Sequence, residues 1–311
     1  MRQIRISRRK PAPFFLGIGA QKAGSSYLYE CLSQHPEITL PPIKELHWFD
    51  EAEGQYARNL RERFRLMKVP RNRRWVKVLA MSGSKRLVTF DLPSAFWIFK
   101  FMLLNRELTE SAVAAYVRLT RHVFRPNVTG DITPYYAALR PSTIRFIRRY
   151  IPDARILYIL RNPVDRDFSE LSMYARDHQL RQLSDIPAAY VDRVIDGGIH
   201  SNYLGNLINW VDIFGRQAVH VELFESLTEE PQSTLGRIQS FLGVSKCDIG
   251  SRAPHARVNA SKPIEISSSG RLAHVRRYQN DILALAEYLK IWPHIPVERV
   301  RGWSSVKTKG T

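Results

Sequence analysis

The chain is poor in cysteine and has no long apolar segment. Cys31 and Cys247 are its only cysteines among 311 residues, which gives no basis for a disulfide framework or a cysteine metal site. No apolar run reaches the about eighteen residues that a membrane-spanning helix requires. The N-terminus is basic like that of a signal peptide, but the apolar stretch behind it is short and broken by glycines. These absences favour a soluble globular protein with a sizeable core.

Acidic residues are also scarce relative to basic ones. The chain has 47 Lys and Arg against 29 Asp and Glu, a net charge of +18. The excess is concentrated in residues 1–10, with five basic residues and no acid, and in residues 54–88, with eleven basic residues and one acid. A charge run is usually a solvated face, but Tyr56, Phe64 and Trp75 among these residues favour a binding surface. Such a field attracts anionic ligands.

Residues 14–29 have the pattern of a strand, a glycine-rich turn and the start of a helix. Backbone N–H groups and the positive end of the helix then face a common point, where an anion binds. Glycine and serine turns between a strand and a helix also occur without a ligand. The pattern therefore needs a second motif to support nucleotide binding.

This loop departs from that of nucleoside-triphosphate enzymes. In the pattern G-x-x-x-x-G-K-[ST], Gly19, Gly24 and Ser26 match. Ser25 stands where the lysine is required, and Lys22 precedes the second glycine. The loop is therefore predicted to bind a different anionic nucleotide.

A second anion-binding motif follows the apolar run 156–160, which is typical of a buried parallel strand. Arg161 comes at its carboxyl end, Asn162 suits a helix cap and Pro163 suits a first helical turn. Ser169 lies roughly two turns further on. A guanidinium with a hydroxyl nearby can clamp a phosphate. A helix-capping ion pair is the alternative for Arg161.

The two motifs together resemble those of sulfotransferases that use 3′-phosphoadenosine 5′-phosphosulfate (PAPS). In that family a loop K-x-G-[ST]-[ST] holds the 5′-phosphosulfate, and a segment L-R-[ND]-P…S holds the 3′-phosphate. The resemblance implies a cofactor site formed by Lys22, Ala23, Gly24, Ser25, Ser26, Arg161 and Ser169. Further matches follow in the family's order over roughly residues 14–243: 44–49, 133–136, Tyr203 with Leu207 and Trp210, Phe224 with Glu225 and Leu227, and 241–243.

The expected fold is α/β, a doubly wound parallel sheet flanked by helices, as in P-loop sulfotransferases. A single domain is expected over 1–311, with a core at about 13–290, a basic helical insertion at about 50–125 with apolar centre 96–104, and a basic tail at about 291–311. Strands are expected near 13–18, 38–40, 128–131, 155–160 and 219–223, and helices near 24–34, 163–178, 200–214, 228–242 and 271–290.

The resemblance also assigns chemical roles. Sulfuryl transfer requires in-line alignment and neutralisation of charge on the leaving group, for which Lys22 is the candidate beside the loop amides. Glu45 and His47, two apart in a segment expected to be extended, share a face. In carbohydrate-type members the glutamate is the base and the histidine assists; in aryl- and steroid-type members a histidine is the base. Glu45 is preferred here as the base, and Asp50 completes the resemblance to the carbohydrate pattern E-x-H-x-x-D. A hydrogen-bonded spacer is the alternative for His47.

Some positions depart from the family pattern. Ile132 stands where many carbohydrate members have a lysine, and Ser26 where glycosaminoglycan members often have an arginine. Both departures disfavour a heparan-like acceptor. The late loop that closes over the nucleotide has two candidates, residues 257–262 and 269–271.

The expected function is transfer of a sulfuryl group from PAPS to a hydroxyl or amine of a carbohydrate or glycoconjugate, without a metal. An anionic glycan fits the basic surface, and no specific nucleic acid is expected. Golgi members carry a membrane anchor, for which a chain beginning at Met1 has no room, so a cytoplasmic enzyme is expected. The alternatives are a sulfotransferase of a small-molecule, lipid or phenolic acceptor, a nucleotide kinase with a degenerate loop, and a basic nucleic-acid-binding protein.

Overall fold

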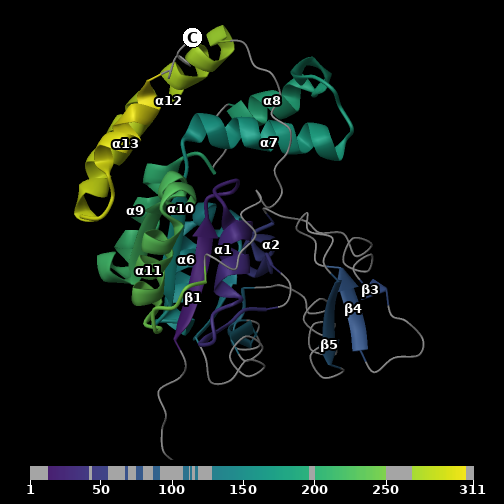
Figure 1. Cartoon of the computed structure of the whole chain (residues 1–311), viewed down its shortest axis with the longest axis vertical. Coiled ribbons are helices and arrows are strands. Elements are labelled where there is room, and N and C mark those ends of the chain that lie inside the picture. The colour runs from purple at the N-terminus through teal and green to yellow at the C-terminus, as the bar shows by residue number, and fades with distance from the viewer. Residues whose placement is uncertain are drawn as a thin grey trace, which may run out of the picture.

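A five-stranded sheet forms the centre of the computed structural model (Figure 1). Its strands pair only in parallel, in the order β2-β6-β1-β7-β8. They are β2 (Ile38–Thr39), β6 (Val128–Ile132), β1 (Phe14–Gly19), β7 (Arg155–Leu160) and β8 (Val219–Leu223). The structure describes residues 13–41, 44–54, 67–68, 75–79, 87–91, 108–111, 113, 116–117, 128–195, 200–249 and 268–305.

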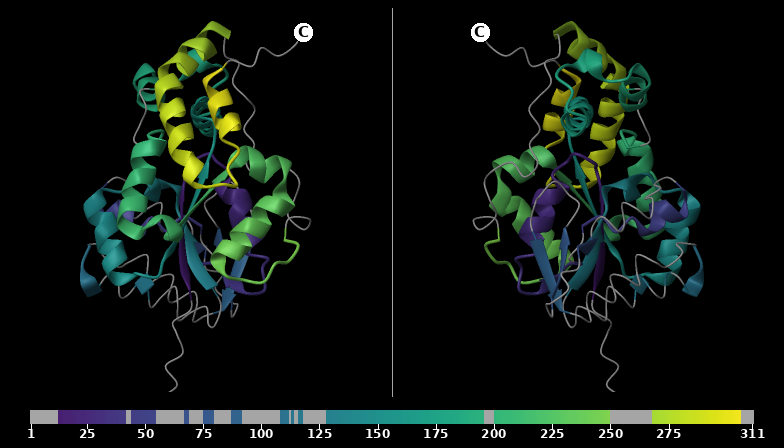
Figure 2. Two further views of the ribbon diagram at one scale, coloured as in Figure 1. Left: turned by 90° about the vertical axis from the view of Figure 1, so that its left-hand side faces the viewer. Right: turned by 90° about the vertical axis from the view of Figure 1, so that its right-hand side faces the viewer.

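Helices cover both faces of this sheet, which confirms the expected doubly wound α/β fold (Figure 2). Every residue of β1 is buried, as in a strand with both faces covered. The helices are α1 (Ser25–Leu32), α2 (Trp48–Ala52), α6 (Pro141–Tyr150), α7 (Pro163–Asp177), α8 (Ala188–Ile195), α9 (Tyr203–Phe214), α10 (Phe224–Glu229), α11 (Pro231–Leu242), α12 (Ser268–Tyr288) and α13 (Val297–Arg301). None of the described helices is long and apolar enough to cross a bilayer.

The expected helical character of the insertion at 50–125 is wrong for much of its described part. β3 (Met67–Lys68), β4 (Trp75–Leu79) and β5 (Leu87–Asp91) form a separate antiparallel sheet there. β4 and β5 are rich in aromatic and β-branched residues, which favour strands, and the surrounding basic residues obscured this short signal. The expected apolar centre, residues 96–104, lies outside the described residues.

The C-terminal part is more ordered than the sequence suggested. Residues 291–305, expected in a basic tail, contain α13 and bury Trp292, Val300 and Trp303. Figures 1 and 2 show α13 beside α12. The single helix expected at 228–242 is two helices, because Pro231 begins a new one. Helices α6, α8 and α13 were not expected.

Candidate active site

The loop between β1 and α1 presents an uncapped helix N-terminus. Gly24 precedes α1 with a left-handed φ of 83°, makes no side-chain cap, and no acid lies in the first turn. A Cβ atom at Gly24 would come within 3.0 Å of the Phe224 ring, so both the backbone angle and the space favour glycine. The positive end of α1 is therefore not neutralised by its own side chains, which suits an anion.

Lys22, in this loop, is a partly buried cation. Its Nζ lies 3.1 Å from Sδ of Met173 on α7. Burial lowers the pKa of the Lys22 ammonium to about 8; Arg176 and Arg161 act in the same direction, and Glu170 opposes them. A bound anion would offset the repulsion from these arginines.

Arg161 connects the two predicted phosphate motifs, which are 139 residues apart in the sequence. It follows β7, and its Nη1 donates to the carbonyl oxygen of Lys22 at 2.8 Å. Its guanidinium lies 4.6 Å from the centre of the Phe224 ring. Ser169, half-buried on α7, precedes Met173 by one turn. The structure therefore brings Lys22, Arg161 and the α7 face of Ser169 to one place.

Glu45 and His47 also come together, although their segment is not extended as expected. Both have left-handed φ angles, 62° and 52°. A turn of the backbone, not the alternation of side chains along an extended strand, therefore brings the two side chains together. His47 Nε2 lies 3.5 Å from Glu45 Oε2, and its Nδ1 lies 2.6 Å from Asp50 Oδ2. Lys44 forms an ion pair with the other Glu45 oxygen. The side chain of Glu45 is 24% exposed and that of His47 only 2%, so Glu45 is the one that reaches solvent.

The charges of this cluster shift its pKa values in opposite directions. Burial raises the pKa of the Glu45 carboxyl, but Lys44 and His47 outweigh burial and hold it at about 2. Burial lowers the pKa of His47, but Asp50 and Glu45 outweigh it and raise the pKa above its ordinary value. The cluster is therefore a chain of alternating charges that favours ionised Glu45.

Asp131, at the end of β6, holds this segment in place. Its carboxylate accepts hydrogen bonds from Tyr136 (2.7 Å) and Thr133 (2.9 Å). The Leu46 N–H also donates to it, at 3.5 Å. The Trp48 N–H donates to the Tyr136 hydroxyl at 2.9 Å. The backbone on both sides of His47 is thus fixed by Tyr136, which lies in the matched segment 133–136, and by Asp131, to which the sequence reasoning gave no role.

Tyr135 joins the Glu45 cluster to the loop between β1 and α1. Its ring centre lies 5.2 Å from that of His47. Its hydroxyl accepts a hydrogen bond from Nε2 of Gln21, in the loop, at 3.1 Å. The Gln21 oxygen accepts from Arg166 of α7 at 3.1 Å. Gln21 and Arg166 were not predicted, although the Thr-Pro-Tyr-Tyr motif did contain Tyr135.

Helix α12 is attached to this region through Asp167. The Asp167 carboxylate accepts a hydrogen bond from the Tyr278 hydroxyl at 2.8 Å and lies 2.9 Å from Nε2 of His274. Tyr278 and His274 are both on α12. Residues 269–271, a candidate for the loop over the nucleotide, instead belong to the first turns of α12. Arg271 donates there to Asp165. The other candidate, residues 257–262, lies outside the described residues.

Comparison with known proteins identifies one family. A sequence profile described as "Sulfotransferase family" matches residues 13–248. Carbohydrate sulfotransferase 15 of Rattus norvegicus is 22% identical over 265 residues, covering 76% of this chain and 45% of the relative. The Homo sapiens protein of the same name is 22% identical over 264 residues with the same coverage. This chain thus spans about half the length of these curated relatives.

Two solved structures share the fold. The crystal structure of a sulfotransferase from Alicyclobacillus acidocaldarius aligns with a TM-score of 0.58 at 24% identity, covering 90% of this chain and 96% of that one. The sulfotransferase domain of the Synechococcus PCC 7002 olefin synthase aligns with a TM-score of 0.51 at 16% identity, covering 97% and 90%. At these identities the likeness is evidence for the fold alone.

Proposed function

Because the chain belongs to the sulfotransferase family, we propose that it transfers a sulfuryl group from PAPS to a hydroxyl or amine of a carbohydrate. The observation that carries the proposal is a chain of contacts from one motif to the next. Arg161 donates to the Lys22 carbonyl, and Tyr135 contacts both Gln21 of the same loop and His47, the partner of Glu45. Two cationic side chains beside the start of α1 suit a nucleotide with two separate anionic ends. Because the chain belongs to this family, we no longer consider the alternatives of a nucleotide kinase and a nucleic-acid-binding protein.

Lys22 and Arg161 take the two anionic ends in this proposal. PAPS supplies the sulfuryl group on its 5′-phosphate. Lys22 and the first amides of α1 neutralise the charge that develops on the leaving phosphate oxygen as the S–O bond breaks. Arg161 holds the 3′-phosphate, supported by Ser169. A carboxylate cage for magnesium is not part of this mechanism.

Glu45 is the proposed base. As the acceptor oxygen bonds to sulfur, its proton passes to the Glu45 carboxylate, the most exposed member of the cluster. Asp50 orients His47, which holds the second Glu45 oxygen. A carboxylate with a pKa of about 2 is a weak base, so in this proposal Lys44 leaves Glu45 when the acceptor binds.

A carbohydrate acceptor is supported by the names of the curated relatives and by the Glu45, His47 and Asp50 pattern. Ile132 and Ser26 disfavour a heparan-like chain. A small-molecule, lipid or phenolic acceptor is the second candidate, because the 2.6 Å contact between Asp50 and His47 is typical of an oriented histidine base. The two candidates differ in which residue is the base.

A panel of glycans, phenols and alcohols incubated with radiolabelled PAPS tests the proposal. The label is expected on a glycan with the wild-type protein and on no acceptor with Lys22→Ala. Arg301→Ala, which removes a surface arginine of α13, is the matched control and should retain activity. Labelling of phenols alone would transfer support to the second candidate, and no labelling of any acceptor would contradict both.

A further inference from the structure

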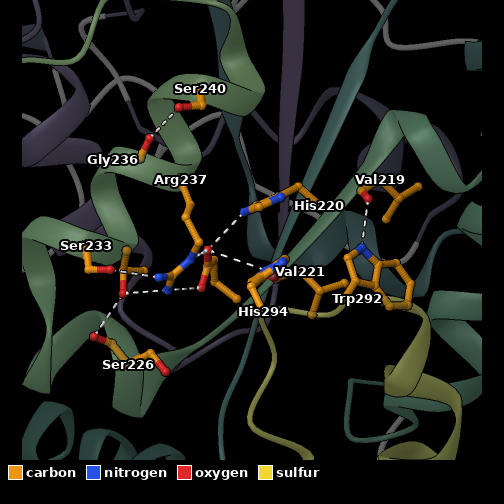
Figure 3. Close-up of polar contacts among 12 residues, drawn as sticks. Val219, His220, Val221, Ser226, Ser233, Gly236, Arg237, Ser240, Trp292 and His294 are labelled. Atoms are coloured by element: carbon orange, nitrogen blue, oxygen red, sulfur yellow. Dashed lines mark hydrogen bonds and ion pairs between the residues drawn. The ribbon is translucent and has the colours of Figure 1, made fainter.

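The outer edge of β8 is covered by side chains from the segment after α12. Trp292 Nε1 donates to the Val219 carbonyl at 3.1 Å, and His294 Nε2 donates to the Val221 carbonyl at 2.8 Å (Figure 3). A hollow of about 310 Å³ opens between this segment and α11. It is lined by Arg216, Gln217, Val219, His220, Arg237, Phe241, Trp292 and His294.

Two histidines that line this hollow, His220 and His294, lie close to the buried Glu222. His220 and Glu222 alternate along β8 and so share a face. Glu222 Oε1 lies 3.0 Å from Nε2 of His220 and 3.7 Å from Nε2 of His294. One ligand atom from each of the three residues lies within 4.8 Å of the others. Ligands at about 2.0–2.2 Å around a tetrahedral zinc ion lie roughly 3.3 Å apart. The two Glu222 distances are close to this spacing, and the widest separation in the cluster shortens when an ion binds.

The two arginines of the hollow do not make it an anion site. Arg237 donates to both oxygens of Glu222, at 2.8 and 2.9 Å, and to Ser233 at 2.9 Å. Arg216 donates to the carbonyl oxygens of Ile291 and Val219. Both guanidinium groups are thus committed to protein acceptors. The possible ligand atoms of the two histidines and the carboxylate lie within 4.8 Å of one another, although the two imidazole rings are stacked with their centres 4.9 Å apart. Ligating carboxylates are themselves commonly hydrogen-bonded, as Glu222 is by Arg237.

We propose that His220, Glu222 and His294 bind one divalent ion of the zinc class, with water from the hollow in the fourth position. Binding replaces the contact between His220 and Glu222 with two metal bonds. The His294 ring turns out of its stack on His220 and ligates through Nδ1, or through Nε2 once the bond to Val221 is released. The ion ties the chain after α12 to the edge of the sheet and stabilises the fold there. None of these three residues belongs to the candidate active site.

Titration of the tag-free, chelator-stripped full chain with Zn²⁺ tests this site. One ion per chain is expected by calorimetry. At free Zn²⁺ about 100 times Kd, the Tm should rise by about 5 °C. Co²⁺ provides a second readout, because tetrahedral coordination gives it strong visible absorption bands. An unchanged Tm together with the weak spectrum of hydrated Co²⁺ would overturn the proposal.

His294→Gln is the decisive variant, because a glutamine amide can still donate to the Val221 carbonyl but offers no imidazole lone pair. It and His220→Gln should each weaken Zn²⁺ binding by at least about 100-fold, since loss of even an outer hydrogen-bond partner costs 10–100-fold. His178→Gln, a change at the exposed histidine that follows α7, should leave Zn²⁺ binding like that of the wild type. If both cluster variants bind Zn²⁺ as tightly as the wild type, the ion is bound elsewhere and the proposal is wrong.

Discussion

Raising the pH from about 7 to about 9.5 should weaken the binding of adenosine 3′,5′-bisphosphate about 30-fold. In the free protein, burial and the neighbouring Arg176 and Arg161 lower the pKa of Lys22 to about 8. A bound phosphate stabilises the ammonium and raises its pKa, so binding takes up a proton above pH 8. Affinity then falls tenfold per pH unit until the pKa of the complex is reached. At about 1.5 units above the free pKa, the loss is about 30-fold, or about 2 kcal/mol.

Calorimetric titration across this pH range, in two buffers of different ionisation enthalpy, measures both the affinity and the proton uptake. The ligand contributes little, because the second pKa of its phosphates is about 6 and this ionisation is nearly complete at pH 7 and above. Lys22→Arg keeps the charge at every pH of the series and should remove the slope. A flat wild-type profile, or a slope that persists in Lys22→Arg, would refute the assignment of Lys22 to the phosphate.

Three further predictions concern the other residues of the site. Arg161→Ala should weaken adenosine 3′,5′-bisphosphate binding by about 10–100-fold, because a charge-assisted contact contributes about 1.5–3 kcal/mol. The same variant should affect adenosine 5′-phosphosulfate, which lacks the 3′-phosphate, much less; equal losses would exclude the assigned role. Lys44→Met should move the acid limb of the pH profile of kcat/KM, which reports the free enzyme, to higher pH, since Lys44 helps to hold the Glu45 pKa at about 2 before the acceptor binds and loss of activity follows protonation of the base. If the acid limb stays at the same pH in Lys44→Met, Lys44 does not control the pKa of the catalytic base. Turnover at about 25 °C should survive excess chelator, measured with labelled PAPS; activity lost to chelator and restored by magnesium would contradict the mechanism.

Local patterns predicted much of the fold. Buried apolar runs gave the strands β1, β7 and β8 nearly to the residue. Asn162 caps α7 as predicted, accepting from the Val164 N–H at 3.0 Å. These features depend on neighbours in the sequence, where hydrophobic periodicity and capping chemistry act directly.

Features that depend on distant contacts were missed. Asp131 accepts a hydrogen bond from the Leu46 N–H, 85 residues away in the sequence, and Asp167 accepts one from Tyr278, 111 residues away. Left-handed backbone angles are unfavourable for residues other than glycine, yet Glu45 and His47 both have them. The hydrogen bonds from the Leu46 and Trp48 N–H groups to distant side chains hold the segment in this conformation. No local propensity predicts them.

The most direct test of the account is the single-turnover rate of Glu45→Gln and His47→Ala with saturating PAPS and the glycan acceptor. Glutamine keeps the shape of Glu45 but accepts no proton, so Glu45→Gln should lose about 10²–10⁴-fold in rate while its adenosine 3′,5′-bisphosphate affinity stays within about twofold. His47→Ala should lose less. An active Glu45→Gln beside an inactive His47→Ala would contradict the account and make His47 the base.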